Sequence, residues 1–329
     1  MKLFRLLLVL LLVAFAGAAT AVYFTSRPYQ GFADERFIQI PKGTSTRAIA
    51  ATLEREGVIQ HGWQFLLARV LSPGTKLQAG EYRFSKPASA QEVLSRINRG
   101  DTFYLELVVP EGQNMFDIAQ DIKRLHLFSD AQFLQAAKNP SSIRDLDPDA
   151  HSLEGYLWPD TYRLSRTTTA QQLCAAMTRK FRAKWRELHT NANVHKAVTL
   201  ASLVEREARV PADRPLVSSV FHNRLRDGMK LDCDPTTVYA ALLEGRYRGK
   251  IYRSDLDNPN PYNTYKNAGL PPGPIANPGF SSLQAALHPA ETRYLYFVAK
   301  TDGSGGHTFT ENLAQHTAAT AAYRRASAR

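Results

Sequence analysis

The sequence predicts an α+β protein that begins with a membrane-spanning helix. Three observations support this prediction: an uncharged apolar run at the N-terminus, a strand–turn–helix–helix pattern that occurs twice, and a C-terminal half in which amphipathic helices alternate with short strands and an irregular loop. The chain has 329 residues, of which 44% are hydrophobic and 22% charged. This length and composition allow two or three domains with hydrophobic cores and exclude a largely disordered chain.

The apolar run at residues 6–24 is long enough to cross a membrane. It carries no charge, and about 19 helical residues span roughly 30 Å, the thickness of a hydrocarbon core. Lys2 and Arg5 precede it, which predicts a cytoplasmic N-terminus. The segment from Ala19 to Ala21 resembles a signal-peptide cleavage site, but the run continues through Phe24, which favours an uncleaved anchor. No second run of that length follows, so we expect the rest of the chain to lie outside.

The segment after the anchor contains the repeated pattern. "FIQIPKGTSTRAIAATLEREGVI" predicts a short strand, a Pro-Gly turn and a helix that Thr44 or Ser45 could cap, and "LELVVPEGQNMFDIAQDIKRLHLF" is a second copy. A further helical stretch follows each copy, "GWQFLLARVL" in the first and "DAQFLQAAK" in the second. Between them, "AGEYRFSKPASAQEVLSRINRG" predicts a strand and a helix. The pattern indicates two related β-α-α units.

The chain changes character from about residue 152. "LEGYLWPDTYRL" is aromatic and predicted to be irregular, "TTTAQQLCAAMTRKFRAKWRELH" is a long amphipathic helix, and "RPLVSSVFHNRLRDGM" is a helix that ends at Gly228. "LDNPNPYNTYKNAGLPPGPIANPGF" is a loop too long to be a simple connector. "YLYFVAK" and "GGHTFT" predict a hairpin, and a helix from about Glu311 closes the chain.

One glutamate in "LASLVEREAR" lies where an apolar side chain is expected. Steps of about 100° per residue place Glu207 on the apolar arc of this helix, whereas Glu205 falls outside it, as a surface or supporting charge. A buried carboxylate is costly unless it is paired or protonated. Two interpretations follow: Glu207 pairs with an arginine in the core, or it stays protonated near neutral pH and serves as an acid.

Charge and cysteine content limit the classes of function. The net charge of +11 fits an anionic partner or a solvated basic surface, and no nucleic-acid-binding motif is present. Cys174 and Cys233 are far apart in sequence and show no metal-ligand spacing, so we interpret them as separate small core residues rather than a disulfide. Histidines form no HExxH-like cluster. We therefore predict neither a metal nor a cofactor.

Several long motifs in the same order resemble the MltG (YceG-like) endolytic murein transglycosylases. They are "TLASLVEREARVPADRPLVSSVFHNRLRDGMKLDCDPTTVYA", "LEGYLWPDTY", "NPYNTYKNAGLPPGPIANPG", "SLQAALHPAETRYLYFVA" and "GGHTFTENLAQH". The resemblance covers nearly everything after Leu153, and the anchor and the region that follows fit in order and size. It implies a transmembrane segment at residues 1–30, a LysM-like β-α-α-β module at 31–105, a second unit at 106–150 and a mixed α+β catalytic domain at 151–329.

The resemblance also implies a reaction at the second glutamate of the E-x-E pair, Glu207. Such enzymes cut the β-1,4 bond between N-acetylmuramic acid (MurNAc) and N-acetylglucosamine (GlcNAc) within a glycan strand, and the C6 hydroxyl of MurNAc attacks its own anomeric carbon. One carboxyl group suffices, first as acid and then as base.

Other positions carry over as candidate substrate-binding residues. Glu154 could orient the sugar, tune Glu207 or cap a helix, and Asn223, which with Arg224 matches the family's "NRL", could hydrogen-bond sugar groups. Asp232 stands where the family often has an uncharged residue, and its charge could raise the pKa of Glu207 or alter contacts with the substrate. His307 and His316 are interpreted as structural hydrogen-bonding residues. The aromatic and polar loop side chains suited to sugar rings, unless they only pack the loop, are Tyr262, Asn263, Thr264 and Tyr265.

The expected partners are peptidoglycan glycan strands and the membrane, with peptidoglycan synthases as further candidates. The expected location is the inner membrane, with the catalytic domain on the periplasmic side. Two alternatives remain: a catalytically silent wall-binding scaffold, and a muramidase that uses water and a second carboxylate, for which Glu154 or Asp232 could serve.

Overall fold

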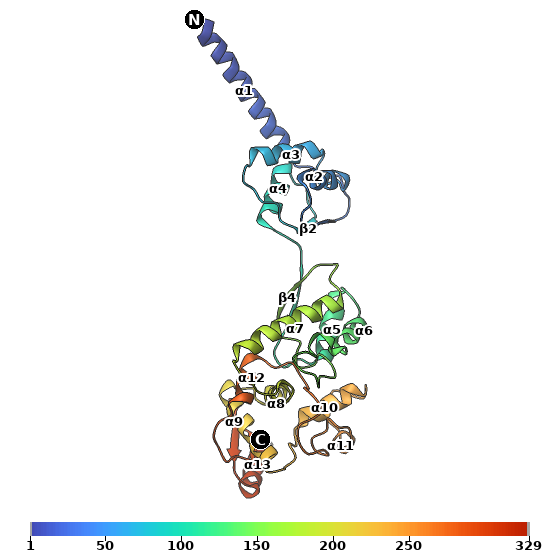
Figure 1. Cartoon of the computed structure of the whole chain (residues 1–329), viewed down its shortest axis with the longest axis vertical. Coiled ribbons are helices and arrows are strands. Elements are labelled where there is room, and N and C mark those ends of the chain that lie inside the picture. The colour runs from blue at the N-terminus through green and yellow to red at the C-terminus, as the bar shows by residue number, and fades with distance from the viewer. Residues whose placement is uncertain (1, 328–329) are drawn as a thin grey trace. The chain divides into compact units, whose positions relative to one another are not determined.

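A computed structural model describes residues 2–327 and the side chains of residues 4–327 (Figure 1). The chain forms two compact units, Met1–Leu105 and Glu106–Arg329. Both mix helices with two-stranded sheets, so the predicted α+β class is confirmed.

The first unit begins with a helix that is apolar enough to cross a membrane. This helix is α1 (Lys2–Ser26), and its segment Phe4–Ser26, with a mean hydropathy of 2.5, is exposed over most of its length and buries Thr25 near its end. It covers the predicted apolar run. The elements that follow are β1 (Arg36–Ile40), α2 (Thr46–Arg55), α3 (Gly62–Leu71), β2 (Gly80–Phe84) and α4 (Ala90–Arg99).

A small antiparallel sheet with helices on one face forms the rest of this unit. Strand β1 pairs with β2, with Ile38 opposite Tyr82. Ile38 and Ile40 alternate with exposed Gln39, so one face of the strand packs into the core and the other faces solvent. Ser45 caps α2, since its hydroxyl accepts a hydrogen bond from the Ala48 amide at 3.2 Å.

The second unit begins with the other copy of the pattern. Its elements are β3 (Leu105–Val109), α5 (Met115–Leu125), α6 (Asp130–Ala137) and β4 (Asp160–Leu164), and β3 pairs with β4. Both copies therefore have the order β-α-α-β. The prediction that "LEGYLWPDTYRL" is irregular was wrong for its last five residues, where buried Tyr162 and Leu164 alternate with exposed residues in β4. The strand that pairs with β3 thus lies beyond residue 150.

Helix α8 (Val194–Glu207) forms the centre of the second unit. Every side chain from Ala197 to Val204 is buried, and α9 (Arg214–Arg226), α12 (Phe280–Leu287) and α10 (Asp234–Leu243) pack against it (Figure 1). The remaining helices are α7 (Ala170–Glu187), α11 (Arg253–Leu256) and the short 3-10 helices η1 (Pro140–Ser142) and η2 (Pro211–Asp213).

The predicted hairpin and final helix are present. Strand β5 (Tyr296–Ala299) pairs antiparallel with β6 (His307–Thr310), and α13 (Leu313–Ser327) packs on both. Helix α9 ends at Arg226, just before Gly228, as predicted. The long loop between α11 and α12 is hydrogen-bonded to the buried helix α8, since the Ile275 amide donates to the Ser202 hydroxyl at 3.1 Å.

Candidate active site

Glu207 is the last residue of α8. The backbone leaves the helix at Ala208, so the Glu207 carboxyl group lies beside the negative end of the helix dipole, which disfavours its ionised form. One of its oxygens, Oε1, accepts a hydrogen bond from the Cys233 thiol, with 3.2 Å between sulfur and oxygen. The residue is half-buried, so one side of it stays accessible.

The surroundings raise the pKa of Glu207 to about 7. Burial of the carboxyl group is the largest cause, and the negative charge of Asp234 adds to it, while the Cys233 hydrogen bond and the positive charge of Arg206 act in the opposite direction. A carboxyl group with this pKa is populated in both protonation states near neutral pH. It can therefore give and take a proton, which suits a group that serves first as acid and then as base.

Glu207 opens into a cavity of about 450 Å³. The cavity combines charged, hydroxyl-bearing and aromatic side chains, a composition suited to sugars. Its walls come from the ends of α8 and α9, the segment before α10, the long loop, β5 and α13. The lining residues are Glu207, Phe221, Arg224, Leu231, Asp232, Cys233, Asp234, Tyr265, Tyr296, Phe297, Leu313 and His316.

Three hydrogen bonds fix the segment that carries Cys233. The Cys233 amide donates to the Thr264 hydroxyl at 3.0 Å, and the Cys233 carbonyl accepts from the Thr236 hydroxyl at 2.6 Å. The two threonine hydroxyls are 2.9 Å apart. Because this segment is braced on both sides, the thiol meets Glu207 in a defined position. Cys174 and Cys233 are both buried and free, so no disulfide links them.

Arg224 holds the same segment from the opposite wall. It donates to the Leu231 carbonyl and to the Asp232 carboxylate, both at 3.1 Å, and its guanidinium lies 5.0 Å from the centre of the Tyr296 ring. Asp232 is thus paired with Arg224, and the neighbouring charge that raises the pKa of Glu207 is that of Asp234. A contact of Asp232 with the substrate, the other possibility, stays a prediction.

Glu205 is a supporting charge but not a surface one. Its side chain is only 6% exposed, and its carboxylate accepts from Arg214 at 3.2 Å and from the Gly279 amide at 3.0 Å. The helical arc failed as a guide here because α8 is buried on all sides. The partners of the two glutamates distinguish them: Glu205 is held by an arginine, whereas Glu207 meets a thiol and a cavity.

Glu154 lies beneath the first turn of α5 and does not line the Glu207 cavity. It is buried, and its carboxyl group accepts hydrogen bonds from the Met115 amide and from the Asn277 side chain, both at 2.9 Å. Burial raises its pKa to about 8, partly offset by the Met115 hydrogen bond. This geometry corresponds to the helix-cap interpretation.

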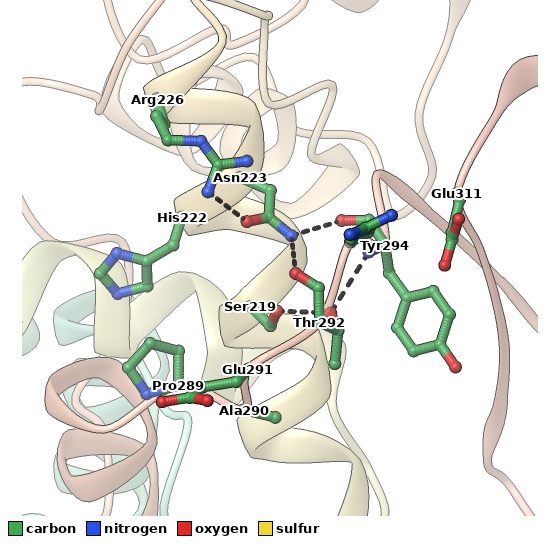
Figure 2. Close-up of a pocket in the computed structure, with 11 residues that line it drawn as sticks. Ser219, His222, Asn223, Arg226, Pro289, Ala290, Glu291, Thr292, Tyr294 and Glu311 are labelled. Carbon is green, nitrogen blue, oxygen red and sulfur yellow. Dashed lines mark hydrogen bonds between the residues drawn. The ribbon is translucent and has the colours of Figure 1, made fainter.

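Asn223 faces a different cavity of about 760 Å³ (Figure 2). Its amide nitrogen donates to the carbonyls of Thr292 at 3.0 Å and Tyr294 at 2.9 Å, and its oxygen accepts from Arg226 at 2.9 Å. The side chain therefore holds the approach to β5 against α9. Both polar atoms of the Asn223 side chain are therefore hydrogen-bonded within the protein, whereas we expected them to contact the sugar.

Most of the Tyr-Asn-Thr-Tyr segment organises the long loop. The Asn263 amide donates to two carbonyls at the end of α11 and, at 2.7 Å, to the loop carbonyl of Asn258, and Thr264 braces Cys233. Tyr262 packs against Tyr239, with ring centres 5.1 Å apart. Tyr265 lines the Glu207 cavity and donates its hydroxyl to Asp234 at 2.7 Å. Of these four residues, only Tyr265 reaches the cavity.

Sequence reasoning missed Cys233 and Asp234 as neighbours of Glu207, because their proximity depends on how distant segments fold. His307 bonds to Asp213 at 3.0 Å, as expected for a structural histidine. His316 instead lines the cavity, and its ring stacks on that of Tyr296 with 5.0 Å between the ring centres.

Among the described residues, no cluster of three or more His, Cys, Asp or Glu side chains could hold a metal ion.

Comparison with known proteins places the chain in a family. The model of the YceG-like family matches residues 38–322, which include the cavity, the second β-α-α-β unit and all but the first two residues of the first. The chain belongs to the YceG-like family. A crystal structure of a yceG-like protein from Listeria monocytogenes is similar, with a TM-score of 0.55 and 33% identity over 86% of this chain and 98% of that one.

Two curated relatives of this YceG-like chain are named endolytic murein transglycosylase. The one from Bacillus subtilis is 36% identical over 87% of this chain and 84% of its own length. The one from Streptococcus pneumoniae strain D39 is 30% identical over 85% of this chain, which spans 58% of that longer relative.

Proposed function

We propose that this YceG-like chain is an endolytic peptidoglycan lytic transglycosylase. It cleaves the MurNAc-β-1,4-GlcNAc bond within nascent glycan strands, leaves a 1,6-anhydro-MurNAc end, and so terminates strand elongation. The observation that carries the proposal is a glutamate with a pKa of about 7 at the wall of a polar, aromatic cavity. The names of the relatives support the same reaction.

Glu207 performs both proton transfers in the proposed mechanism. The protonated carboxyl group gives its proton to the glycosidic oxygen as the bond from that oxygen to C1 of MurNAc breaks, and the GlcNAc chain leaves with a free hydroxyl group. The carboxylate then takes the proton of the C6 hydroxyl as O6 bonds to C1 of the same sugar. No water is consumed, and Glu207 returns to its protonated form.

The other carboxyl groups in the cavity are engaged by neighbours. Asp232 is paired with Arg224, and Asp234 accepts the Tyr265 hydroxyl. A hydrolase of the usual kind needs a second carboxyl group that activates water or attacks the sugar. The engagement of Asp232 and Asp234 therefore favours the lytic reaction over a muramidase, and the exposed side of Glu207 favours an enzyme over a silent scaffold.

Product analysis tests the reaction type. The detergent-solubilised full chain is incubated with purified glycan strands, and the new ends are identified by mass spectrometry. We expect 1,6-anhydro ends from the natural sequence and none from Glu207→Gln. Reducing ends with an added water would identify a hydrolase and contradict the proposal, and no cleavage by the folded natural protein would favour the scaffold.

The proposal includes the arrangement of the chain at the membrane. Helix α1 serves as a single-pass anchor of the inner membrane, with a cytoplasmic N-terminus and the remainder on the periplasmic side. The β-α-α-β units serve as LysM-like modules that help to capture glycan, and synthases of peptidoglycan are candidate partners. Mass analysis of the membrane-extracted protein tests the anchor, since a mature chain beginning near Val22 would identify a cleaved signal peptide instead.

A further inference from the structure

Helix α3 carries an apolar face that the first unit leaves largely exposed. Val70 is 74% exposed, Leu71 49% and Trp63 47%, and Leu67 is half-buried. Steps of about 100° per residue place these four side chains on one side of α3, within about 80° of Trp63. The opposite side carries Phe65 and Ala68, which are buried in the core of the unit. The helix is therefore apolar on both faces.

The exposed face of α3 is the side on which α1 stands. The Phe24 ring of α1 meets the Trp63 ring edge to face at 5.5 Å, and the Gln64 side chain donates to the Phe24 carbonyl at 3.2 Å. Figure 1 shows α3 lying across the end of α1. The end of the membrane-spanning helix thus contacts the face of α3 that contains Trp63.

The level of α3 corresponds to a membrane interface. A helix of the length of Phe4–Ser26 extends about 34 Å, slightly more than a hydrocarbon core of about 30 Å. Ser26 therefore falls near the outer boundary of that core, where tryptophan and tyrosine are enriched in membrane proteins. Exposed Tyr23 and Trp63 both lie at this level, and Arg27 places its guanidinium 5.4 Å from the centre of the Tyr23 ring.

The charged side chains next to the exposed face of α3 are compatible with a position at the membrane interface. The carboxylate of Glu54, at the start of α3, accepts the Gly62 amide at 2.9 Å and lies 3.8 Å from His61. Arg69 turns away, since it donates to the Ser72 carbonyl at 3.2 Å. An apolar helical face flanked by cations and engaged polar groups is typical of helices that lie in the interface plane.

We propose that α3 is an interfacial helix whose face of Trp63, Leu67, Val70 and Leu71 lies in the outer leaflet of the bilayer that α1 crosses. The first unit is then seated on the lipid surface rather than suspended from it by a flexible tether. Apolar faces of such helices enter the boundary between headgroups and acyl chains by about 5–10 Å. The inference rests on the proposed anchoring of α1 and is independent of the proposed chemistry of Glu207.

Quenching by brominated lipids tests the inference in the full chain. An environment-sensitive fluorophore is attached to Val70→Cys, and the protein is reconstituted into phosphatidylethanolamine–phosphatidylglycerol vesicles with and without brominated acyl chains. The native cysteines are buried, and the labelled unsubstituted chain gives their background. The matched control is Gln39→Cys, which is exposed on the sheet face opposite the helices. Phe15→Cys, in the middle of α1, reports insertion of the anchor.

We expect strong quenching at position 15, clear quenching with blue-shifted emission at position 70, and none at position 39. A Leu71→Asp substitution at its exposed site should weaken the quenching at position 70 several-fold, because a charge in the acyl boundary is unfavourable. Unquenched emission at position 70 with position 15 quenched would overturn the inference, and a blue shift without quenching would identify a protein partner or a second copy instead. If position 15 is also unquenched, the anchor and the inference fail together, while the reaction remains testable by its anhydro product.

Discussion

The two copies of the strand–turn–helix motif share a backbone but not a role. Gly43 and Gly112 occupy equivalent places in the turns, both with φ of +81°, a conformation that favours glycine. Around Gly43 there is open space, and Lys42 is exposed. Around Gly112 lie the side chains of Glu205 and Arg206. The same local sequence pattern therefore builds a free turn in one unit and a packed turn in the other.

The second turn is tied to the end of α8 that carries Glu207. The Gly112 carbonyl accepts from Arg206 at 2.9 Å, and its amide donates to the Asn277 carbonyl at 2.9 Å. Glu111 lies 3.7 Å from Arg214, the residue that also holds Glu205. Burial raises the pKa of Glu111, with a contribution from the charge of Glu205. The second copy therefore forms part of the framework that holds the end of α8 and the candidate active site, whereas the first copy's turn is free.

The largest effect is expected at the end of α8 itself. Glu207→Gln keeps the size of the side chain but cannot transfer a proton, so we expect cleavage to fall by about 10³-fold or more, in the range of general acid–base contributions. Because Gln removes a buried carboxyl group with a pKa of about 7, thermal unfolding should stay cooperative and occur at the same or a higher temperature, which shows that the fold is intact. Glu205→Gln is the matched control and should keep much more activity. Substantial turnover by folded Glu207→Gln would refute the assignment.

The next effect concerns the arginine that links the second turn to α8. Arg214→Met leaves the Glu205 carboxylate buried without its cation, so we expect unfolding of the second unit to become easier by about 3 kcal/mol. Denaturant titration measures this change. The control is Arg209→Met, at an exposed position, which should change stability by less than about 0.5 kcal/mol. Equal effects of the two substitutions would show that the Glu205–Arg214 pair does not hold α8.

A pH-dependent effect distinguishes the first turns of α5 and α2. Glu154 has its pKa raised to about 8 when folded, so the folded state binds its proton more tightly than the unfolded chain does. Its stabilising contribution is complete below the unfolded pKa of about 4.5 and is lost as the pH rises through about 8. Glu207, with a pKa of about 7, acts in the same direction.

We therefore expect the thermal stability of the second unit to fall between about pH 5 and about pH 8.5, and Glu154→Gln to flatten this decline. Ser45→Ala removes the cap of α2 and is the control. It should lower the stability of the first unit by about 1 kcal/mol at every pH and leave cleavage unchanged. A decline in Glu154→Gln as steep as in the natural protein would show that Glu154 is not the titrating group.

The sequence predicted what depends on neighbouring residues. Helix positions, the Ser45 cap, the Gly228 stop and the hairpin all follow from local patterns. The strand β4 was missed because Trp158, Pro159 and the aromatic residues around them resemble a loop more than a strand. Its pairing with β3 requires contacts across the whole second unit, which periodicity cannot show.

Polar site residues were harder to interpret than apolar ones. Asn223, Asn263 and Thr264 have the chemistry of sugar ligands, yet backbone groups of the protein occupy their hydrogen-bonding atoms. Residue type alone cannot reveal which partner a side chain finds. The thiol of Cys233 looked like a small core group, and only the long-range packing of the Thr264 segment brings it to Glu207.

Exchange of charge between the two turns tests most directly the claim that the second copy, and not the first, supports the active site. Glu111→Lys places a cation beside Arg214, whereas Lys42→Glu makes the reciprocal change at the equivalent exposed position. With short soluble glycan strands, we expect Glu111→Lys to lower kcat by about tenfold, an energy of about 1.4 kcal/mol, and Lys42→Glu to leave kcat unchanged. Equal kcat values for the two folded variants would contradict the account.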